Sequence, residues 1–104
     1  MSPKPINLSK AIIYKIFSVD PKISECYIGH TTRIVKRRAH HKAACMKHKK
    51  ESTLYNFIRA NGGFDNFRCV KILDCPATSR EEILEAEERI INSGSYNTCL
   101  NLKM

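Results

Sequence analysis

The chain has 104 residues, of which 18 are Lys or Arg and 10 are Asp or Glu, so its formal charge is +8. This length supports one domain with a modest core and excludes a separate DNA-reading module of useful size. Residues 1–50 hold twelve Lys/Arg against Asp20 and Glu25, whereas residues 51–104 hold six against eight acids. A basic excess often serves solubility, but this uneven distribution favours a polyanionic partner.

Cysteine usage and hydropathy indicate an intracellular protein in a reducing compartment. The N-terminus lacks the apolar segment of a signal peptide, and no apolar run is long enough to span a bilayer. The five cysteines are odd in number and form no CxxC pair: Cys26, Cys45, Cys69, Cys75 and Cys99. We therefore expect free thiols, a location in the cytoplasm or nucleus, and no membrane partner.

The N-terminal half is expected to form a tail, a hairpin and a helix. Residues 1–10 are rich in Pro and Lys and are interpreted as a flexible basic tail before a single domain of residues 11–104. β-Branched and aromatic residues predict strands over 11–17 and 26–29, with a turn at Asp20-Pro21-Lys22.

Residues 32–50 contain neither Gly nor Pro and predict a strongly basic helix. The helical wheel separates two stripes, which we interpret as faces with different roles. One stripe holds Arg37, His41, Ala44 and His48, and the other holds Ile34, Val35, Cys45 and Met46.

A short helix and a third strand follow. Ser52 or Thr53 can cap the helix, and Gly62-Gly63 ends it. The alternating run of residues 67–73 predicts the strand.

The last predicted helix opens at one of two capping boxes, Thr78-x-x-Glu81 or Ser79-x-x-Glu82, and ends at Gly94. Its apolar residues Ile83, Leu84, Ile90 and Ile91 form one arc, and Glu87 falls at the middle of that arc. A carboxylate on such a face requires a cation, a metal or several donors to compensate for lost water. A salt bridge to an arginine is one solution, and a divalent metal is the interpretation that we prefer.

These elements carry motifs in a defined order. Ile12-Ile13-Tyr14 lies in the first strand and Tyr27-Ile28-Gly29 in the second, and the basic helix carries Arg37 and His41. The later motifs are Leu54-Tyr55-x-x-Ile58, Gly62-Gly63-x-x-x-Phe67 and the glutamate helix. Over about residues 11–101 the set resembles the GIY-YIG nuclease family, with Ile12 standing where that family has glycine.

The resemblance implies an α+β fold in which a small, mainly antiparallel three-stranded sheet is flanked by helices. It also implies a metal-dependent endonuclease that hydrolyses DNA phosphodiester bonds. Because no targeting segment of any size accompanies the domain, low intrinsic sequence specificity is expected. A monomer or weak dimer is expected, with a separate DNA-targeting partner as an option.

The resemblance assigns six catalytic candidates: Tyr14, Tyr27, Arg37, His41, Glu87 and Asn101. Tyr14 would activate water, and Tyr27 would share that role or orient the phosphate. Arg37 would grip phosphate oxygens, while His41 would bind phosphate or relay a proton. Glu87 would hold Mg²⁺, or Mn²⁺, together with several waters. Two alignments stay open, with Glu88 in place of Glu87 and Asn97 in place of Asn101.

Nucleic-acid contacts are expected mainly from the basic helix and its surroundings. The candidates are Lys15, His30, Arg33, Lys36, Arg38 and Lys42. Phosphate contacts by such residues give affinity that falls steeply with salt.

A nucleic-acid-binding module without catalysis is the alternative function. Zinc could stabilise it through His40, His41, Cys45 and His48, with Cys69 or Cys75 nearby. A degenerate nuclease that only binds DNA is a second form of this alternative, because Ile12 replaces the family's glycine.

Overall fold

The computed structural model describes residues 8–47 and 52–93. Within these ranges, short 3₁₀ helices η1 (Leu8–Lys10) and η2 (Phe64–Asn66) accompany the strands and α-helices. The strands are β1 (Ile12–Ser18), β2 (Cys26–Thr31) and β3 (Phe67–Asp74), and the α-helices are α1 (Ile34–Lys47), α2 (Thr53–Ala60) and α3 (Arg80–Asn92).

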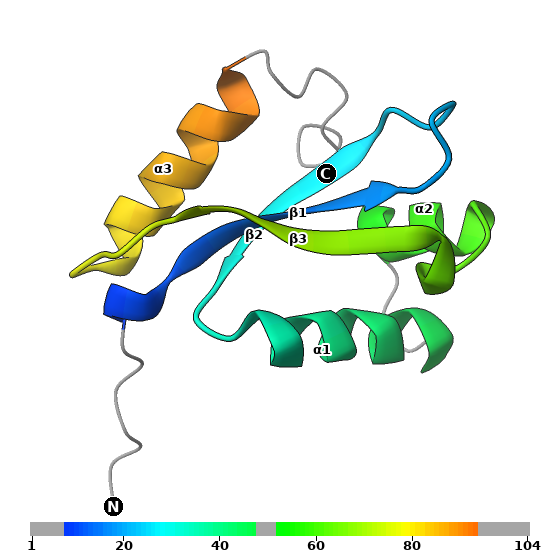
Figure 1. Ribbon diagram of the computed structural model, residues 1–104, viewed down its shortest axis with the longest axis horizontal. Coiled ribbons are helices and arrows are strands. Elements are labelled where there is room, and N and C mark those ends of the chain that lie inside the picture. The colour runs from blue at the N-terminus through cyan, green and yellow to red at the C-terminus, as the bar shows by residue number, and fades with distance from the viewer. Residues whose placement is uncertain (1–7, 48–51, 94–104) are drawn as a thin grey trace, which may run out of the picture.

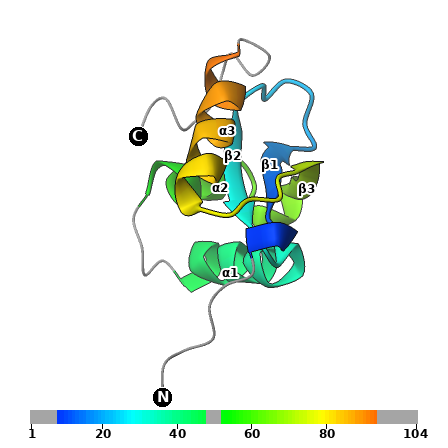
Figure 2. The same ribbon diagram turned by 90° about the vertical axis from the view of Figure 1, so that its left-hand side faces the viewer.

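The three strands form one antiparallel sheet in the order β2-β1-β3. In the β1–β2 hairpin Tyr14 is the partner of Gly29, and on its other side Tyr14 is the partner of Lys71. Figure 1 shows α3 on one side of the sheet and α1 on the other, and Figure 2 shows the same separation after a quarter turn. The predicted α+β fold is confirmed.

Helices cover both faces of the sheet, so successive residues of β1 enter different hydrophobic clusters. Ile13 packs with Ile28 and with α3, whereas Tyr14 and Ile16 pack with residues of α1 and α2. Ile13 is 0% exposed and Ile16 is 1% exposed. Burial on both faces explains why β1 is apolar along most of its length.

The predicted division of α1 into two stripes is wrong. Val35 and Met46 are 73% and 68% exposed, although the wheel grouped them with Cys45. The face toward the sheet instead contains Cys45 and His41, which are 3% and 5% exposed. Polarity misleads here because a histidine fills a position that an apolar residue normally occupies.

Local signals set the other helix ends. The Ser52 hydroxyl accepts the Tyr55 amide at 3.0 Å, and the Ser79 hydroxyl accepts the Glu82 amide at 3.4 Å, so serine caps begin both α2 and α3. After α2, Gly62 and Gly63 adopt φ values of 97° and 85°, which favour glycine.

The ordered fold begins before the predicted boundary at residue 11. Leu8 packs beside Ala11, Ala77 and Ile83, and its carbonyl accepts the Ala77 amide at 3.0 Å. Residues 8–10, which the sequence assigned to the tail, thus pack against the domain, and residues 1–7 lie outside the described ranges. Of the helices that these ranges contain, none is long and apolar enough to cross a membrane.

Gly29 permits a close approach between β2 and the ring of Tyr14. A Cβ atom at this position would lie 2.5 Å from both Cζ and Oη of Tyr14. Such a contact is too short for a real Cβ, so any larger residue must displace the ring or the strand.

Gly29→Ala is expected to lower the free energy of unfolding by ~1–3 kcal/mol because it overpacks the contact with Tyr14. Chemical denaturation of Gly29→Ala, Tyr14→Leu and the double variant would measure the coupling between the two positions. The penalty should largely disappear when Tyr14 is already Leu. Equal penalties in both backgrounds would contradict a direct clash with the ring.

Candidate active site

A buried hydrogen-bonded chain joins three elements on the α1 side of the sheet. The Tyr14 hydroxyl of β1 lies 2.9 Å from Nε2 of His41, and Nδ1 of that ring lies 3.0 Å from the Tyr55 hydroxyl of α2. Tyr14, His41 and Tyr55 are 2%, 5% and 8% exposed. We call these residues the Tyr–His–Tyr chain.

The environment keeps this chain electrically neutral. Burial raises the pKa of Tyr14 well above its ordinary value, with Tyr27 adding to the rise and Arg37 opposing it. Burial, with Arg37 and His40, lowers the pKa of His41 to about 4. At neutral pH Tyr14 is therefore a phenol and His41 a neutral imidazole with one donor and one acceptor nitrogen.

The other catalytic candidates within the described ranges act on Tyr14 or lie beside His41. Tyr27 is half-buried on β2, and its ring centroid lies 6.4 Å from that of His41. Arg37 is exposed on α1, and its charge acts on Tyr14, His41 and Tyr55. The charge of Glu87 also reaches Tyr14, where it raises the pKa. The structure thus places Tyr14 and His41 in contact, with Tyr27 beside the His41 ring and the charges of Arg37 and Glu87 acting on Tyr14.

Glu87 approaches this group from α3. Its Oε2 lies 2.6 Å from Nδ1 of His30 on β2, and the side chains are 15% and 28% exposed, respectively. The carboxylate faces the sheet as predicted, but its hydrogen-bonding partner is a histidine rather than an arginine. The edge strand β2 thus carries Tyr27 on the face toward α1 and His30 on the face toward α3.

The apolar arc that predicted the direction of Glu87 is only partly correct. Ile83 is 1% exposed and Ile90 and Ile91 pack under α3, whereas Leu84 is 48% exposed. Ala86 occupies part of the apolar face that the sequence assigned to Leu84. The alternative carboxylate Glu88 is exposed and lines a shallow outer hollow with Glu85 and Arg89. The geometry therefore favours Glu87 over Glu88 as the inward carboxylate.

The donor set near Glu87 suits a hard divalent cation that keeps much of its water. His30 engages Oε2, which leaves Oε1 to meet another ligand. Mg²⁺ is commonly held by one or two carboxylates, waters and substrate phosphates. Within residues 8–47 and 52–93, no group of three or more His, Cys, Asp or Glu could hold a metal ion. Glu87 fits as the protein anchor of such an ion, with His30 as its immediate neighbour.

The predicted zinc cluster does not assemble in the part of the chain that the structure describes. Both ring nitrogens of His41 hydrogen-bond to tyrosine hydroxyls, so neither nitrogen is available to coordinate zinc. Cys45 and Cys69 are buried free thiols whose pKa values are raised by burial, which disfavours the thiolate that zinc requires. His48 lies outside the described residues.

Most nucleic-acid candidates lie on or next to α1. Arg33 and Lys36 are exposed there, Arg38 donates to the Cys69 carbonyl at 2.8 Å, and Lys42 lies 3.5 Å from Asp65.

Two of these candidates lie elsewhere. Lys15 points to the sheet face opposite Tyr14, with its ammonium 4.6 Å from the ring centroid of Phe17. His30 faces Glu87. The structure therefore separates Lys15 from the basic face of α1.

Tyr55 is the site residue that sequence reasoning did not identify. The sequence placed it in a motif of the second helix, yet its hydroxyl completes the Tyr–His–Tyr chain. The available signal was a polar aromatic residue among the apolar positions of a short helix. Asn101 and its alternative Asn97 lie outside the described residues.

The fold and the residues around Tyr14 define a small α+β domain of the nuclease type. A family model of the GIY-YIG catalytic domain matches residues 10–98. The chain therefore belongs to the GIY-YIG family, a nuclease family whose substrates are nucleic acids. No curated protein and no solved structure matches this chain.

His41 makes the stability of the protein depend on pH. The unfolded chain binds a proton at this residue near pH 6.5, whereas the folded protein binds it only near pH 4. Unfolding therefore takes up a proton between these values, and stability is lost as the pH falls from 6.5 to 4. The loss attributable to His41 is expected to be about 3 kcal/mol.

Denaturant unfolding of the wild type, His41→Gln and His40→Gln between pH 4 and 7 would measure this effect. His41→Gln should flatten the pH dependence. His40→Gln, at the exposed neighbouring position, should retain most of the wild-type slope, because burial is the largest cause of the lowered His41 pKa. A wild-type slope in His41→Gln would show that another group causes the loss.

Proposed function

We propose that this protein is a metal-dependent endonuclease that hydrolyses DNA phosphodiester bonds with low intrinsic sequence specificity. The observation that carries the proposal is the buried hydrogen bond between Tyr14 and His41, 2.9 Å long, with the charges of Arg37 and Glu87 both acting on the Tyr14 phenol. Hydrolysis requires a base for water, positive charge for the transition state and stabilisation of the leaving oxygen. These residues provide or recruit each of them.

Tyr14 and His41 act together as the base. The attacking water transfers a proton to the Tyr14 oxygen while the Tyr14 proton moves to Nε2 of His41, 2.9 Å away. The hydroxide equivalent then bonds to phosphorus, and the leaving oxygen takes the electrons of the broken P–O bond. This relay needs no free phenolate, which agrees with the raised pKa of Tyr14.

Arg37 and Tyr27 hold the phosphate. Arg37 is exposed and always charged, so it can donate two hydrogen bonds to non-bridging oxygens as negative charge develops. The half-buried phenol of Tyr27 orients the phosphate relative to Tyr14. Mg²⁺ or Mn²⁺ held by Glu87 would supply Lewis-acid stabilisation of the leaving oxygen. His30 fixes the Glu87 carboxylate through the 2.6 Å contact.

Tyr55 positions His41 for this relay. When Nε2 accepts the Tyr14 proton, Nδ1–H donates to the Tyr55 oxygen and keeps the ring in the required tautomer. The arrangement parallels the orienting residue of a catalytic triad, with a neutral hydroxyl in place of a carboxylate.

The remaining expectations concern the setting of the enzyme. A reducing intracellular compartment, cytoplasm or nucleus, suits the free thiols of Cys45, Cys69 and Cys75. The protein acts as a monomer or weak dimer, with a separate DNA-targeting partner as an option. The excess of positive charge supports affinity for DNA through phosphate contacts.

Glu87→Ala is expected to reduce Mg²⁺-dependent conversion of supercoiled plasmid by at least ~10²-fold, because it removes the anchor of the metal. Glu88→Ala removes the same charge from the exposed face of α3 and should cleave at close to the wild-type rate. Arg37→Ala should lose activity like Glu87→Ala, and EDTA should abolish cleavage by the wild type. All variants should retain their circular dichroism spectra.

The alternative of a binding module makes the opposite prediction. DNA retardation without cleavage in either Mg²⁺ or Mn²⁺, unchanged by Glu87→Ala, would refute the nuclease proposal.

Tyr55→Phe is expected to lower the single-turnover cleavage rate by ~10–100-fold, because His41 loses the group that orients it. The nitrogen NMR shifts of His41 should report a mixture of tautomers in this variant. In a His41→Gln background the substitution should cost little further activity. A full additional loss in that background would assign Tyr55 a role independent of His41.

A further inference from the structure

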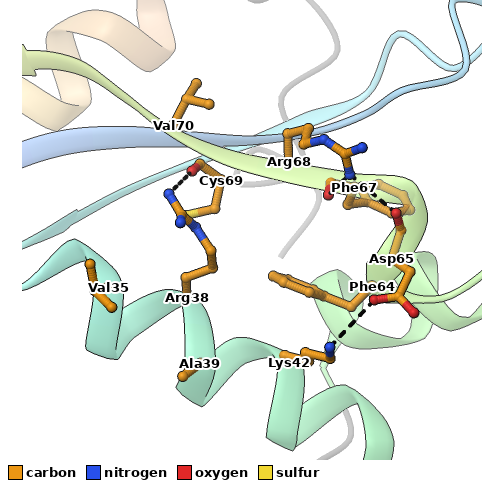
Figure 3. Close-up of a pocket in the computed structure, with 10 residues that line it drawn as sticks. All are labelled: Val35, Arg38, Ala39, Lys42, Phe64, Asp65, Phe67, Arg68, Cys69 and Val70. Atoms are coloured by element: carbon orange, nitrogen blue, oxygen red, sulfur yellow. Dashed lines mark hydrogen bonds and ion pairs between the residues drawn. The ribbon is translucent and has the colours of Figure 1, made fainter.

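A hollow of about 470 Å³ lies between α1 and β3, and none of the six catalytic candidates lines it (Figure 3). We call it the α1–β3 groove. Its cations are Arg38 and Lys42 from α1 and Arg68 from β3, and its one acidic residue is Asp65. Lys42 lies 3.5 Å from Asp65, and their side chains are 52% and 88% exposed. An ion pair this exposed is weak, so Asp65 offsets little of the positive charge of the groove. The groove therefore has a net attraction for anions.

Both guanidinium groups are held in place by the backbone. Arg38 donates through Nη2 to the Cys69 carbonyl at 2.8 Å. Arg68 donates through Nη1 to the carbonyls of Asp65 and Phe67 at 3.1 and 3.0 Å. A guanidinium has five N–H donors, so each group retains donors for a ligand and loses little freedom when it binds one.

Apolar groups lie beside these fixed charges. The Phe64 ring lies between α1 and the start of β3 (Figure 3), Val35 is 73% exposed and Val70 is 39% exposed. A duplex presents phosphates to such a groove but keeps the faces of its bases stacked. An unpaired nucleotide instead offers a flat base for the apolar side chains and a phosphate for the arginines.

The groove is near the proposed site of hydrolysis. Arg37 and Arg38 are adjacent on α1, and they serve the Tyr14 region and β3, respectively. Cys69 pairs with Ile16, two residues along β1 from Tyr14, so the two regions lie roughly 8 Å apart at the backbone. One DNA strand has a phosphate every ~3.4 Å of helix axis, so a few nucleotides span this distance.

We propose that the α1–β3 groove binds an unpaired nucleotide in a single-stranded DNA segment that flanks the phosphodiester to be cleaved. The inference rests on the proposed function for its position relative to the scissile bond. It assigns the enzyme a preference for DNA in which duplex and single strand meet. Arg68 and Phe64 join Arg38 and Lys42 as nucleic-acid contacts.

Fluorescence anisotropy in EDTA, with a labelled oligothymidine and a duplex of equal length, tests the groove without cleavage. Arg68→Gln should weaken single-strand binding by about tenfold and duplex binding by less than about twofold. Arg89→Gln removes the same charge from the exposed face of α3 and should change both affinities by less than about twofold.

A second pair of variants removes any dependence on one arginine. Val35→Asp should selectively weaken single-strand binding, whereas Val19→Asp, at a valine that is 48% exposed in the hairpin turn, should not. Equal effects of Arg68→Gln and Arg89→Gln, or equal losses for single strand and duplex, would overturn the proposal.

The outcome is separable from the nuclease assay. Wild-type protein should cleave a duplex with a single-stranded flap faster than a continuous duplex, and Arg68→Gln should reduce that difference. Glu87→Ala should abolish cleavage and leave selective single-strand binding intact. Loss of the binding preference in Arg68→Gln without any wild-type cleavage would refute the nuclease and retain the groove. Wild-type cleavage without a flap preference would support the nuclease proposal and refute the groove proposal.

Discussion

The burial of Tyr14 is the constraint on which the rest of the structure depends. Its ring fits only because Gly29 has no side chain, and its hydroxyl meets His41 at 2.9 Å. Burial without that partner would leave a polar group unsatisfied at a cost of ~1–3 kcal/mol. His41 must therefore face the sheet, and Tyr55 must satisfy its other nitrogen. The same hydrogen bonds therefore allow Tyr14 to be buried and orient the Tyr14 and His41 side chains relative to each other.

Candidate catalytic residues lie on both buried faces of the sheet. Tyr14, Tyr27 and His41 belong to the side covered by α1 and α2, whereas His30 and Glu87 belong to the side covered by α3. Tyr14 lies on the central strand β1, and the charge of Glu87 still acts on its phenol. The small sheet thus carries a neutral hydrogen-bonded chain on one face and an inward carboxylate on the other.

Local sequence signals predicted much of the fold and part of the site. Three features depend mainly on neighbouring residues and could therefore be predicted from the sequence. They are the strand composition, the serine caps at Ser52 and Ser79, and the inward direction of Glu87. Glu87 pairs with His30, 57 positions away in the sequence, and a helical wheel cannot predict a partner outside its own helix. The helical wheel predicted the wrong buried face for α1, because the hydrogen bonds that allow His41 to be buried come from tyrosines distant in the sequence. The features that could not be predicted are those that depend on contacts between residues far apart in the sequence.

The protonation state of the Tyr–His–Tyr chain is the most direct test of this account. NMR titration of the wild type, with labelled tyrosine ring carbons and histidine ring nitrogens, would follow Tyr14 and His41 separately. The account predicts that Tyr14 remains protonated at pH ~10, the ordinary phenol pKa, and that His41 stays neutral down to a pH of about 4. A Tyr14 phenolate near neutral pH, or a His41 that is charged at pH 6, would contradict the neutral relay.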